Sequence, residues 1–537
     1  MLMAAVMLCG TLTTHGTAIE HTGDRYIIHV DEMDLTGEES LGEVLAMCPE
    51  VIDFDALGAN LAVRTSEFCL LVHNMYYAGD TEQYLAKTKA KEIDYVEVCY
   101  ATGTMRGNEG LYGIIDVYYK KGSNGTSGRV SAKADSYGTL TTLNTVKVER
   151  DNLTVWGQLT GGLKNEKVND VKTHRGDETA AVGMIWQINS KNRLTAQVQH
   201  SYSETKDISF DIRDRDHYAD INLFYLATLS DRGATMEVQA FFAHQNNKIL
   251  AESIGDTYKT KITMPAGVVE FCVPLYKDKL SVVAGAEGGV EVDDYDYETQ
   301  GYVNQNWYYD FYGELDWNIH GVNLSIGDRV RTNRYCLHTE AEPSHENNTN
   351  HFFNFSVFGN ISEHSLLKGT FAKSMLSPTY LDVSRKDEAY ISELRYEYQQ
   401  PHFRLTAFVN NSHTNYFYHA NTFQVGTSAF WHKGVLRLSA ALNYYNVLGS
   451  ITEDMHCNVL QARLQPMLTL HDGWQIVPQL AYSSFIRLEG SSLPAHLNAS
   501  LRVTKSIKNW DFDLIGNNLA HQRYGRRSVA LGVTYNW

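Results

Sequence analysis

From Gly128 to the C-terminus, the sequence alternates apolar residues with small or polar ones. Runs such as TLTTLNTVKVE (139–149), LTVWGQLTG (153–161) and TAAVGMIWQI (179–188) show the alternation clearly. Successive side chains on a β-strand point to opposite faces, so a period of two predicts strands. Continued to the end of the chain, the pattern predicts about 22 strands of roughly ten residues, a length that suits a tilted strand crossing a bilayer.

The predicted connections alternate between short and long. Short ones fall near 150–152, 191–192, 230–232, 277–278, 320–321, 362–363, 400–401, 432–433, 471–473 and 507–508. Longer polar segments lie between them, at 163–178, 204–217, 244–256, 293–305, 336–348 and 375–388. Only the first hairpin, around Gly138, is short where a long one is due. Outer-membrane barrels have short periplasmic turns and long outer loops, whereas a soluble sandwich has no reason to sort its loops by parity.

The last strand shows how the two faces differ. One face carries apolar and aromatic residues, and the other carries Ala530, Gly532, Thr534 and Asn536. A closed sheet of about 22 strands is too wide for side chains to fill. We therefore expect the apolar face to meet lipid and the lumen to be polar. Aromatic clusters at 306–317 and 473–482 suit interfacial girdles, although ordinary strand propensity also accounts for each of them.

Composition excludes some classes of protein. The chain has 46 Lys and Arg against 63 Asp and Glu, a net charge of −17, whereas a general nucleic-acid binder needs basic surface. Seven scattered cysteines suggest neither a zinc site nor a disulfide framework. The apolar start, Met1–Leu12, followed by Gly16 and Ala18, predicts a signal peptide, with a buried first helix as the alternative.

Residues 24–122 do not show the continuous two-residue alternation, and they mix helix-like with strand-like runs. A helix-like run within 37–51 stops at Pro49, and a second short helix is expected within 80–94. LAVRT (61–65) and FCLLVHN (68–74) suggest a strand pair, and YVEVCY (95–100) and GIIDVYY (113–119) suggest two more strands. A small mixed α/β domain ahead of so wide a barrel either hangs below it or fills it, and filling it avoids a large hole.

Several segments resemble TonB-dependent outer-membrane receptors and transporters. The matching segments are SLGEVLAMCPEV, LAVRT, FCLLVHNMYYAG and EIDYVEVCYATGTMRGNEGLYGIIDVYYKKG in the N-terminal part, SPTYLDVS and AYISELRYEY in mid-chain, and the C-terminal LRVTKSIKNWDFDLIGNNLAHQRYGRRSVALGVTYNW. The resemblance implies an outer-membrane β-barrel of about 22 antiparallel strands that holds an N-terminal α/β plug, with 1–18 as signal peptide, 19–123 as plug and 124–537 as barrel.

The resemblance also assigns plug residues with structural and gating roles. They are Arg64, Glu97, Gly103, Gly110 and Gly113. Two departures stand out: Thr65 replaces a glycine of the family pattern, and His73–Asn74 replace an Asp-Gly turn. No clear hydrophobic-acidic box for the energising protein precedes the plug. The implied partners are outer-membrane lipid, the barrel assembly machinery, a TonB-type energising protein and a small-molecule or oligosaccharide substrate, with no nucleic acid and no cofactor.

Candidate binding residues lie on the predicted outer loops. His338, His345, His413 and Tyr416 are the candidates for substrate. His338 and His345 lie among Glu340, Glu342 and Glu346, a mixture that suits a transition metal, although a solvated loop is the plainer interpretation and no metal is assigned. The acidic 293–298 segment suits calcium or an exposed loop. His and aromatic residues at 412–423 suit sugars, haem-like rings or an interfacial girdle.

Three functions remain open on these grounds. The leading one is a non-enzymatic, plug-gated importer of a scarce nutrient such as a ferric chelate, haem, a cofactor or an oligosaccharide. The second is a binding protein or channel of the same fold without energised transport, which the missing box favours. A soluble secreted β-protein such as a propeller is disfavoured by the loop parity and by the lack of a 40–50-residue repeat. No Ser/His/Asp or paired-carboxylate arrangement indicates an enzyme.

Overall fold

The computed structural model describes most of the chain. The described residues are 18–22, 25–33, 35, 39–55, 60–63, 68–77, 81–100, 113–120, 124–168, 171–208, 210–251, 256–276, 279–297, 300–338, 343–375, 388–415, 419–450, 455–488, 491–520 and 527–537. Within them, no helix combines the length and the apolar character needed to cross a membrane.

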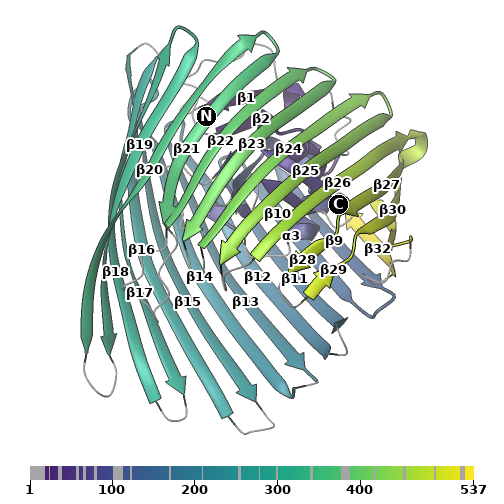
Figure 1. Cartoon of the computed structure of the whole chain (residues 1–537), viewed down its shortest axis with the longest axis horizontal. Coiled ribbons are helices and arrows are strands. Elements are labelled where there is room, and N and C mark those ends of the chain that lie inside the picture. Colours follow the sequence, from purple (N-terminus) through teal and green to yellow (C-terminus); the bar gives the residue numbers. More distant parts are fainter. Residues whose placement is uncertain are drawn as a thin grey trace.

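Twenty-two strands form one closed antiparallel barrel (Figure 1). The first half comprises β9 (Gly125–Asp135), β10 (Leu140–Arg150), β11 (Leu153–Val168), β12 (Val171–Asn189), β13 (Asn192–Asp207), β14 (Ile212–Thr228), β15 (Thr235–Ala251), β16 (Asp256–Tyr276), β17 (Leu280–Tyr297), β18 (Gln300–Ile319) and β19 (Val322–His338). The second half comprises β20 (Ser344–Ser362), β21 (Ser365–Met375), β22 (Glu388–Gln400), β23 (Phe403–Asn415), β24 (His419–Lys433), β25 (Leu436–Ser450), β26 (Met455–Leu470), β27 (Trp474–Ser483), β30 (His496–Ile507), β31 (Trp510–Asn517) and β32 (Ser528–Asn536).

The barrel closes where its first and last strands meet. β32 pairs with β9 in antiparallel register, with Val533 opposite Ala132. Two small additions complete the barrel chain: the hairpin of β28 (Ile486–Leu488) and β29 (Ser491–Leu493), and the single 3₁₀ turn η3 (His471–Gly473). The predicted fold class, a barrel of about 22 antiparallel strands with a small N-terminal mixed domain, is confirmed.

The two faces of the wall have the predicted polarity. In β32, Val529, Leu531 and Val533 are 49%, 63% and 39% exposed, whereas Ala530 and Thr534 are 2% and 1% exposed. Because the inner face of β32 is covered and its outer face is not, the apolar residues point away from the barrel axis. The expectation that the apolar face points outward is confirmed for this strand.

The strands are longer than predicted, so the predicted contrast between short and long connections is only partly observed. The predicted short turns fall at or beside the junctions of consecutive strands, for example between β18 and β19 at His320–Gly321, although 432–433 are the last two residues of β24. The segments expected to be long loops are largely strand: β11 runs to Val168 and β12 resumes at Val171, inside the segment predicted as a loop at 163–178. β16 spans 21 residues, about twice the length needed to cross a bilayer.

The extended strand ends explain why the acidic segment 293–298 is not a loop. Residues up to Tyr297 belong to β17, where Asp294 and Asp296 lie opposite Lys261 and Lys259 of β16. Lys259 Nζ is 3.0 Å from Asp296 Oδ2, and Lys261 Nζ is 3.9 Å from Asp294 Oδ2. Beyond the apolar band, both faces of the strands carry polar residues. The alternation of apolar and polar residues is therefore weak there, although the strands stay paired by hydrogen bonds. The interpretation as an exposed acidic loop is therefore wrong for 293–297.

The N-terminal part forms a six-stranded mixed sheet in the order β1-β2-β7-β8-β5-β6. These strands are β1 (Ile19–Thr22), β2 (Arg25–His29), β5 (Phe68–Val72), β6 (Met75–Tyr76), β7 (Ile93–Tyr100) and β8 (Gly113–Tyr119). A separate pair consists of β3 (Val51–Asp55) and β4 (Asn60–Val63). The helices are α2 (Leu41–Leu45) and α3 (Thr81–Lys87), with 3₁₀ turns η1 (Val30–Glu32) and η2 (Ala90–Glu92).

Both helix predictions are confirmed, and one strand prediction is wrong. α2 begins with a capping box in which Ser40 N–H donates to Glu43 Oε2 at 2.7 Å, and Glu43 N–H donates to Ser40 Oγ at 3.3 Å. The predicted pairing of 61–65 with 68–74 does not form. β4 pairs with β3, and β5 instead runs parallel to β8, with Leu70 opposite Ile115. The parallel partner arrives about 40 residues later, so no local pattern could indicate it.

This N-terminal unit, called the plug below, lies inside the ring of barrel strands (Figure 1). Its core includes Leu41, Val44 and Leu45 of α2 and Val96 and Val98 of β7. The same hydrophobic cluster continues into inward-facing barrel side chains: Ala372, Ile391, Phe430, Met467 and Val477. Plug and barrel therefore share one core on the side of the wall formed by β21 to β27.

Candidate functional site: the plug–barrel interface and its cavity

Acidic side chains around α2 hold the plug to one side of the wall. Glu39 pairs with Arg437 of β25, and Glu43 lies 3.7 Å from Arg502 of β30. Gln475 Nε2 of β27 also donates to Glu43 Oε1 at 2.8 Å. The capping box at the start of α2 fixes the backbone around Glu43, so the turn that begins the helix also orients one anchor.

Glu50, just beyond α2, occupies the centre of a buried ionic cluster. Its carboxylate lies 3.2 Å from Arg395 Nη1 of β22 and 3.4 Å from Lys368 Nζ of β21. Arg395 also contacts Glu393 on its own strand at 3.0 Å. All four side chains are buried, so each charge depends on its partners to offset lost hydration.

The backbone after α2 is held as well. Arg395 Nη1 donates to the Pro49 carbonyl at 2.8 Å, and Arg404 Nη1 of β23 donates to the Cys48 carbonyl. Burial raises the pKa of the Cys48 thiol to about 12, so it stays protonated. Tyr26 Oη of β2 donates to Glu397 of β22, and burial raises the pKa of Tyr26 well above its usual value. Cationic barrel residues thus bind two carbonyl groups of the turn that follows α2.

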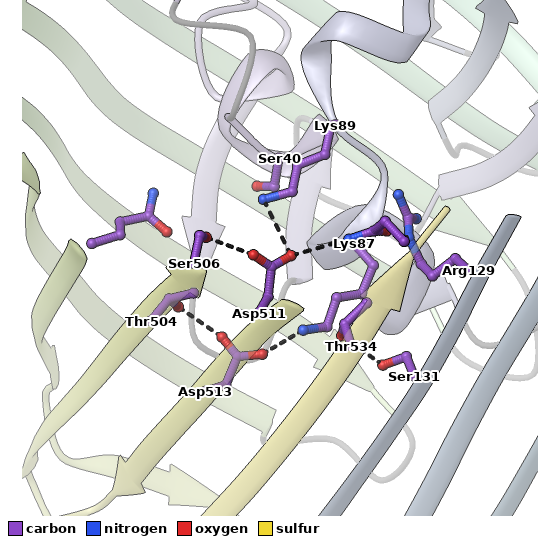
Figure 2. A network of polar contacts seen from close by, with 12 residues as sticks. Ser40, Lys87, Lys89, Arg129, Ser131, Thr504, Ser506, Asp511, Asp513 and Thr534 are labelled. Atoms are coloured by element: carbon purple, nitrogen blue, oxygen red, sulfur yellow. Dashed lines mark hydrogen bonds and ion pairs between the residues drawn. The ribbon is translucent and has the colours of Figure 1, made fainter. Parts of the chain in front are cut away.

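In a second set of anchors the plug supplies the lysines and the barrel supplies the carboxylates (Figure 2). Lys87 of α3 pairs with Asp513 of β31, and Lys89 Nζ lies 4.0 Å from Asp511 Oδ2. Thr504 Oγ1 donates to Asp513 Oδ1 at 2.7 Å, so the carboxylate is held on both sides. Beside this set, Arg129 of β9 contacts Glu92 of η2 at 2.7 Å. The anchors between charged plug and barrel side chains thus lie on β21 to β31 and β9, within the described part of the chain.

A cavity of about 1220 Å³ lies between the plug and the wall over β9 to β13, and it extends to the anchors, where Glu39, Arg437 and Asp511 line it. It reaches the short-turn end of the barrel, where Asn152, Lys508 and Trp537 line it. On the plug side it is lined by His73, Tyr77, Tyr84 and Tyr119, and on the wall side by Trp156, Gln158, Arg193, Gln197 and Gln199. Gln158 Nε2 donates to Tyr77 Oη at 2.8 Å, a neutral contact across this side.

His73 is one of the residues that line the cavity, and its ring is buried. It occupies the β5–β6 turn with Asn74, and both residues have positive φ, 53° and 69°, as a type I′ turn requires. The Tyr119 N–H donates to His73 Nε2 at 3.3 Å, so the ring proton is on Nδ1, and Nδ1 has no hydrogen-bond partner. Burial, together with Arg193 and Lys147, lowers the pKa of His73 to about 3, so the ring is neutral.

Charged side chains of both signs line this cavity, and Arg193 of β13 is one of the cations. Its Nε and one Nη are buried without a hydrogen-bond partner, and its guanidinium lies 5.9 Å from the centre of the Phe224 ring. Together with the acidic, amide and tyrosine side chains of the lining, such cations give the cavity hydrogen-bond donors and acceptors for a polar solute.

The residues assigned from the family resemblance are only partly placed. Arg64, Gly103, Gly110 and Tyr416 lie outside the described residues. Glu97 is buried in β7 and accepts from Arg25 Nη1 of β2 at 3.3 Å, a contact within the plug sheet. Gly113 begins β8, opposite Phe68 and Tyr100 of its neighbours.

The predicted outer-loop histidines lie at strand ends on the rim opposite the short turns. The rings of His338 and His345 are 6.4 Å apart, at the facing ends of β19 and β20, while Glu340 and Glu342 lie outside the described residues. His413 Nδ1 is 2.7 Å from Asn421 Oδ1 of β24. Among the described residues, no contact joins the His338–His345 pair to His413.

The anchors were missed in the sequence, although a signal for them existed. The run GEESLGEVLAMCPE (37–50) brackets a short helix with Glu39, Glu43 and Glu50. The basic partners of these glutamates are arginines at inward positions of the wall strands: Arg395, Arg437 and Arg502. Once the apolar face points outward, a charged residue on the opposite face must meet water or a plug partner.

The fold is similar to that of solved outer-membrane receptors. The copper transporter OprC superposes with a TM-score of 0.73 at 11% identity, covering 96% of this chain and 100% of that chain. The FrpB iron transporter from Neisseria meningitidis gives a TM-score of 0.72 at 12% identity, covering 97% and 100%. The ferric-catecholate import receptor Fiu from E. coli K12 gives 0.69 at 12% identity, covering 97% of each chain.

These likenesses show the fold, a 22-strand barrel with an internal plug, as in TonB-dependent receptors. The sequence itself matches no family model and no curated protein.

Proposed function

We propose that this protein is an outer-membrane receptor-transporter whose plug gates the uptake of a scarce nutrient, and that it is not an enzyme. The observation that carries the proposal is the asymmetry of the plug. Among the described residues, charged anchors hold it to β21–β31 and β9, while over β10–β13 a cavity lined by Arg193 and His73 lies between plug and wall. Such a plug closes the barrel yet leaves one sector that a modest displacement would open.

The outer surface supports a place in a membrane. Aromatic side chains Trp474, Trp510 and Trp537 are all exposed near the short-turn end of the barrel, as in an interfacial girdle. The apolar outward face of strands such as β32 suits lipid. The outer membrane is the bilayer in which closed barrels of this kind reside, so we place the short turns in the periplasm.

The substrate class follows from the cavity chemistry. Charged side chains of both signs, amides and several tyrosines line the cavity, which suits a polar solute rich in charged or hydroxyl oxygens. A ferric chelate fits this description, and solved proteins of similar fold are named as ferric-catecholate and iron importers. A TonB-type partner in the inner membrane would supply the force on the plug, and His338, His345 and His413 on the opposite rim remain candidates for first contact with substrate.

Uptake in a deletion strain tests the proposal. Cells that lack the protein are complemented with the wild-type chain, and accumulation of radiolabelled ferric catechol, ferric citrate or haem is measured with and without a protonophore. We expect saturable uptake of at least one probe that the protonophore abolishes, because an anchored plug needs energy to move.

The alternative outcomes are distinct. Uptake that rises linearly with concentration and ignores the protonophore would identify a channel of the same fold. Surface binding with no accumulation would identify a non-energised binding protein. Either result contradicts the proposed energised transport.

A further inference from the structure

A histidine occurs at each of five consecutive turns on the short-turn rim. From the β18–β19 turn to the β26–β27 turn these residues are His320, His364, His402, His432 and His471. His432 is half-buried at the end of β24, and the other four are exposed. The remaining short turns carry lysine or arginine instead, for example Lys191 and Lys508. Imidazoles are therefore gathered on one sector of this rim.

Two of these histidines are in contact. The ring centres of His402 and His432 lie 4.8 Å apart, with the ring planes at 84°. The backbones are tied as well, because His432 N–H donates to the His402 carbonyl at 3.0 Å. The neighbouring turn is linked in the same way: Gln399 N–H donates to the His364 carbonyl at 2.8 Å. Backbone hydrogen bonds between the strands therefore fix the positions of His402 and His432 relative to each other.

The hydrogen bond of His432 fixes which nitrogen carries the proton. His432 Nε2 lies 2.8 Å from the Pro401 carbonyl oxygen. A carbonyl can only accept, so Nε2 donates and Nδ1 carries the lone pair. Histidines that bind metals usually donate their other ring N–H to a carbonyl or carboxylate in this way, which orients the ring and strengthens the ligand.

The separation of the two rings suits a shared ion. Imidazole nitrogens bind Zn²⁺ at about 2.1 Å, which places the centres of two ligating rings on the order of 5 Å apart. Imidazole also suits Cu²⁺ and Ni²⁺. No group of three or more His, Cys, Asp or Glu among the described residues could hold an ion. Water would therefore complete the coordination, and the ion would exchange readily.

We propose that His402 and His432 form a binding site for a divalent transition-metal ion, Zn²⁺, Cu²⁺ or Ni²⁺, on the short-turn rim. The site lies at the short-turn end of the wall, apart from the plug anchors and the cavity, and it does not depend on the proposed transport function. Its ligands come from two adjacent hairpins, β22–β23 and β24–β25.

Titration of the full-length protein with Cu²⁺ tests the site. The protein is purified in detergent without a histidine tag and stripped with a chelator, and binding is followed by electron paramagnetic resonance at pH 7.5. We expect one ion with two nitrogen ligands in the wild-type protein. His402→Ala and His432→Ala should each leave one nitrogen ligand and weaken binding more than tenfold. Zn²⁺ and Ni²⁺ should compete for the same site.

Single histidines on the same rim are the matched controls. His320→Ala and His471→Ala remove exposed turn histidines for which no ring contact with another histidine is found in the described structure, and both should bind as the wild type does. Binding should also fall between pH 7.5 and 5.5, because protons compete with the metal for imidazole. Unchanged binding by the double variant His402→Ala/His432→Ala, or equal losses in the two controls, would overturn the proposal. Heat-modifiable migration in gels verifies that each variant keeps its barrel.

Discussion

At the scale of single residues, the buried cluster around Glu50 is the most demanding feature of the interface. Arg395 supports Glu50 and Glu393 together and also binds the Pro49 carbonyl. Replacing it with methionine, Arg395→Met, leaves two buried carboxylates short of a partner, which costs about 3 kcal/mol or more. The undocked fraction of the plug should rise on the order of a hundredfold. Ion conductance of the reconstituted protein in planar bilayers measures this change.

An exposed ion pair provides the comparison for this variant. Lys191 and Asp231 are 2.8 Å apart on the short-turn rim, and both are solvent-exposed. Lys191→Met should leave conductance unchanged, since exposed pairs contribute about 0–1 kcal/mol. If both variants conduct like the wild type, the ionic cluster does not hold the plug.

His73 makes the plug sensitive to acid. Its pKa is about 3 in the folded plug and 6.5 in the unfolded chain, so only the unfolded chain takes up a proton between these values. The free energy of unfolding therefore falls as the pH drops below 6.5, by about 1.4 kcal/mol per pH unit from this residue. His73→Asn keeps a side chain that tolerates positive φ and removes the titration.

The expected result is a smaller loss of stability in acid. Between pH 6.5 and pH 5, wild-type plug should lose about 2 kcal/mol more than His73→Asn. Resistance of the plug to protease across urea concentrations at each pH measures the difference. Parallel pH profiles for the two proteins would show that the pKa of His73 is the same in the folded and the unfolded plug, which would contradict the prediction.

At the scale of elements, the seam between β9 and β32 closes the barrel and tolerates no side chain at Gly128. A Cβ there would lie 2.1 Å from the Trp537 ring and 2.7 Å from the Thr145 carbonyl oxygen. Gly128 and Trp537 also exchange backbone hydrogen bonds at 3.1 and 3.0 Å. Gly128→Leu should therefore prevent closure, and the protein should lose heat-modifiable migration. Gly267→Ala is the control, because its nearest neighbour is 3.6 Å away.

At the scale of the whole molecule, barrel closure does not require the plug. The wall is a continuous ladder from β9 to β32, and plug contacts are made by inward side chains. We predict that a chain lacking 19–123 still forms the barrel and conducts ions at least tenfold better than the full-length protein. A variant that assembles but conducts no better would show that the plug is not the barrier; failure to assemble would show that closure needs the plug core.

Much of this molecule could be predicted from local pattern. Alternation along strands such as β32 fixes strand type and gives each strand two chemically distinct faces, because side chains of a strand must alternate. Turn positions such as His320–Gly321 follow from the short polar breaks between runs. Strands and turns can both be predicted without knowledge of the fold, because each depends on residues that lie within a few positions of one another.

Other features depend on partners that are distant in the chain. The pairing of β5 with β8, the contact of Glu50 with Arg395 and the meeting of His402 with His432 join residues that no local period relates. The sequence by itself determined strands, turns and the two-faced wall, since those are properties of short segments. Only the tertiary structure decided where the plug is anchored and where the cavity lies, because each depends on closing the ring around a second domain.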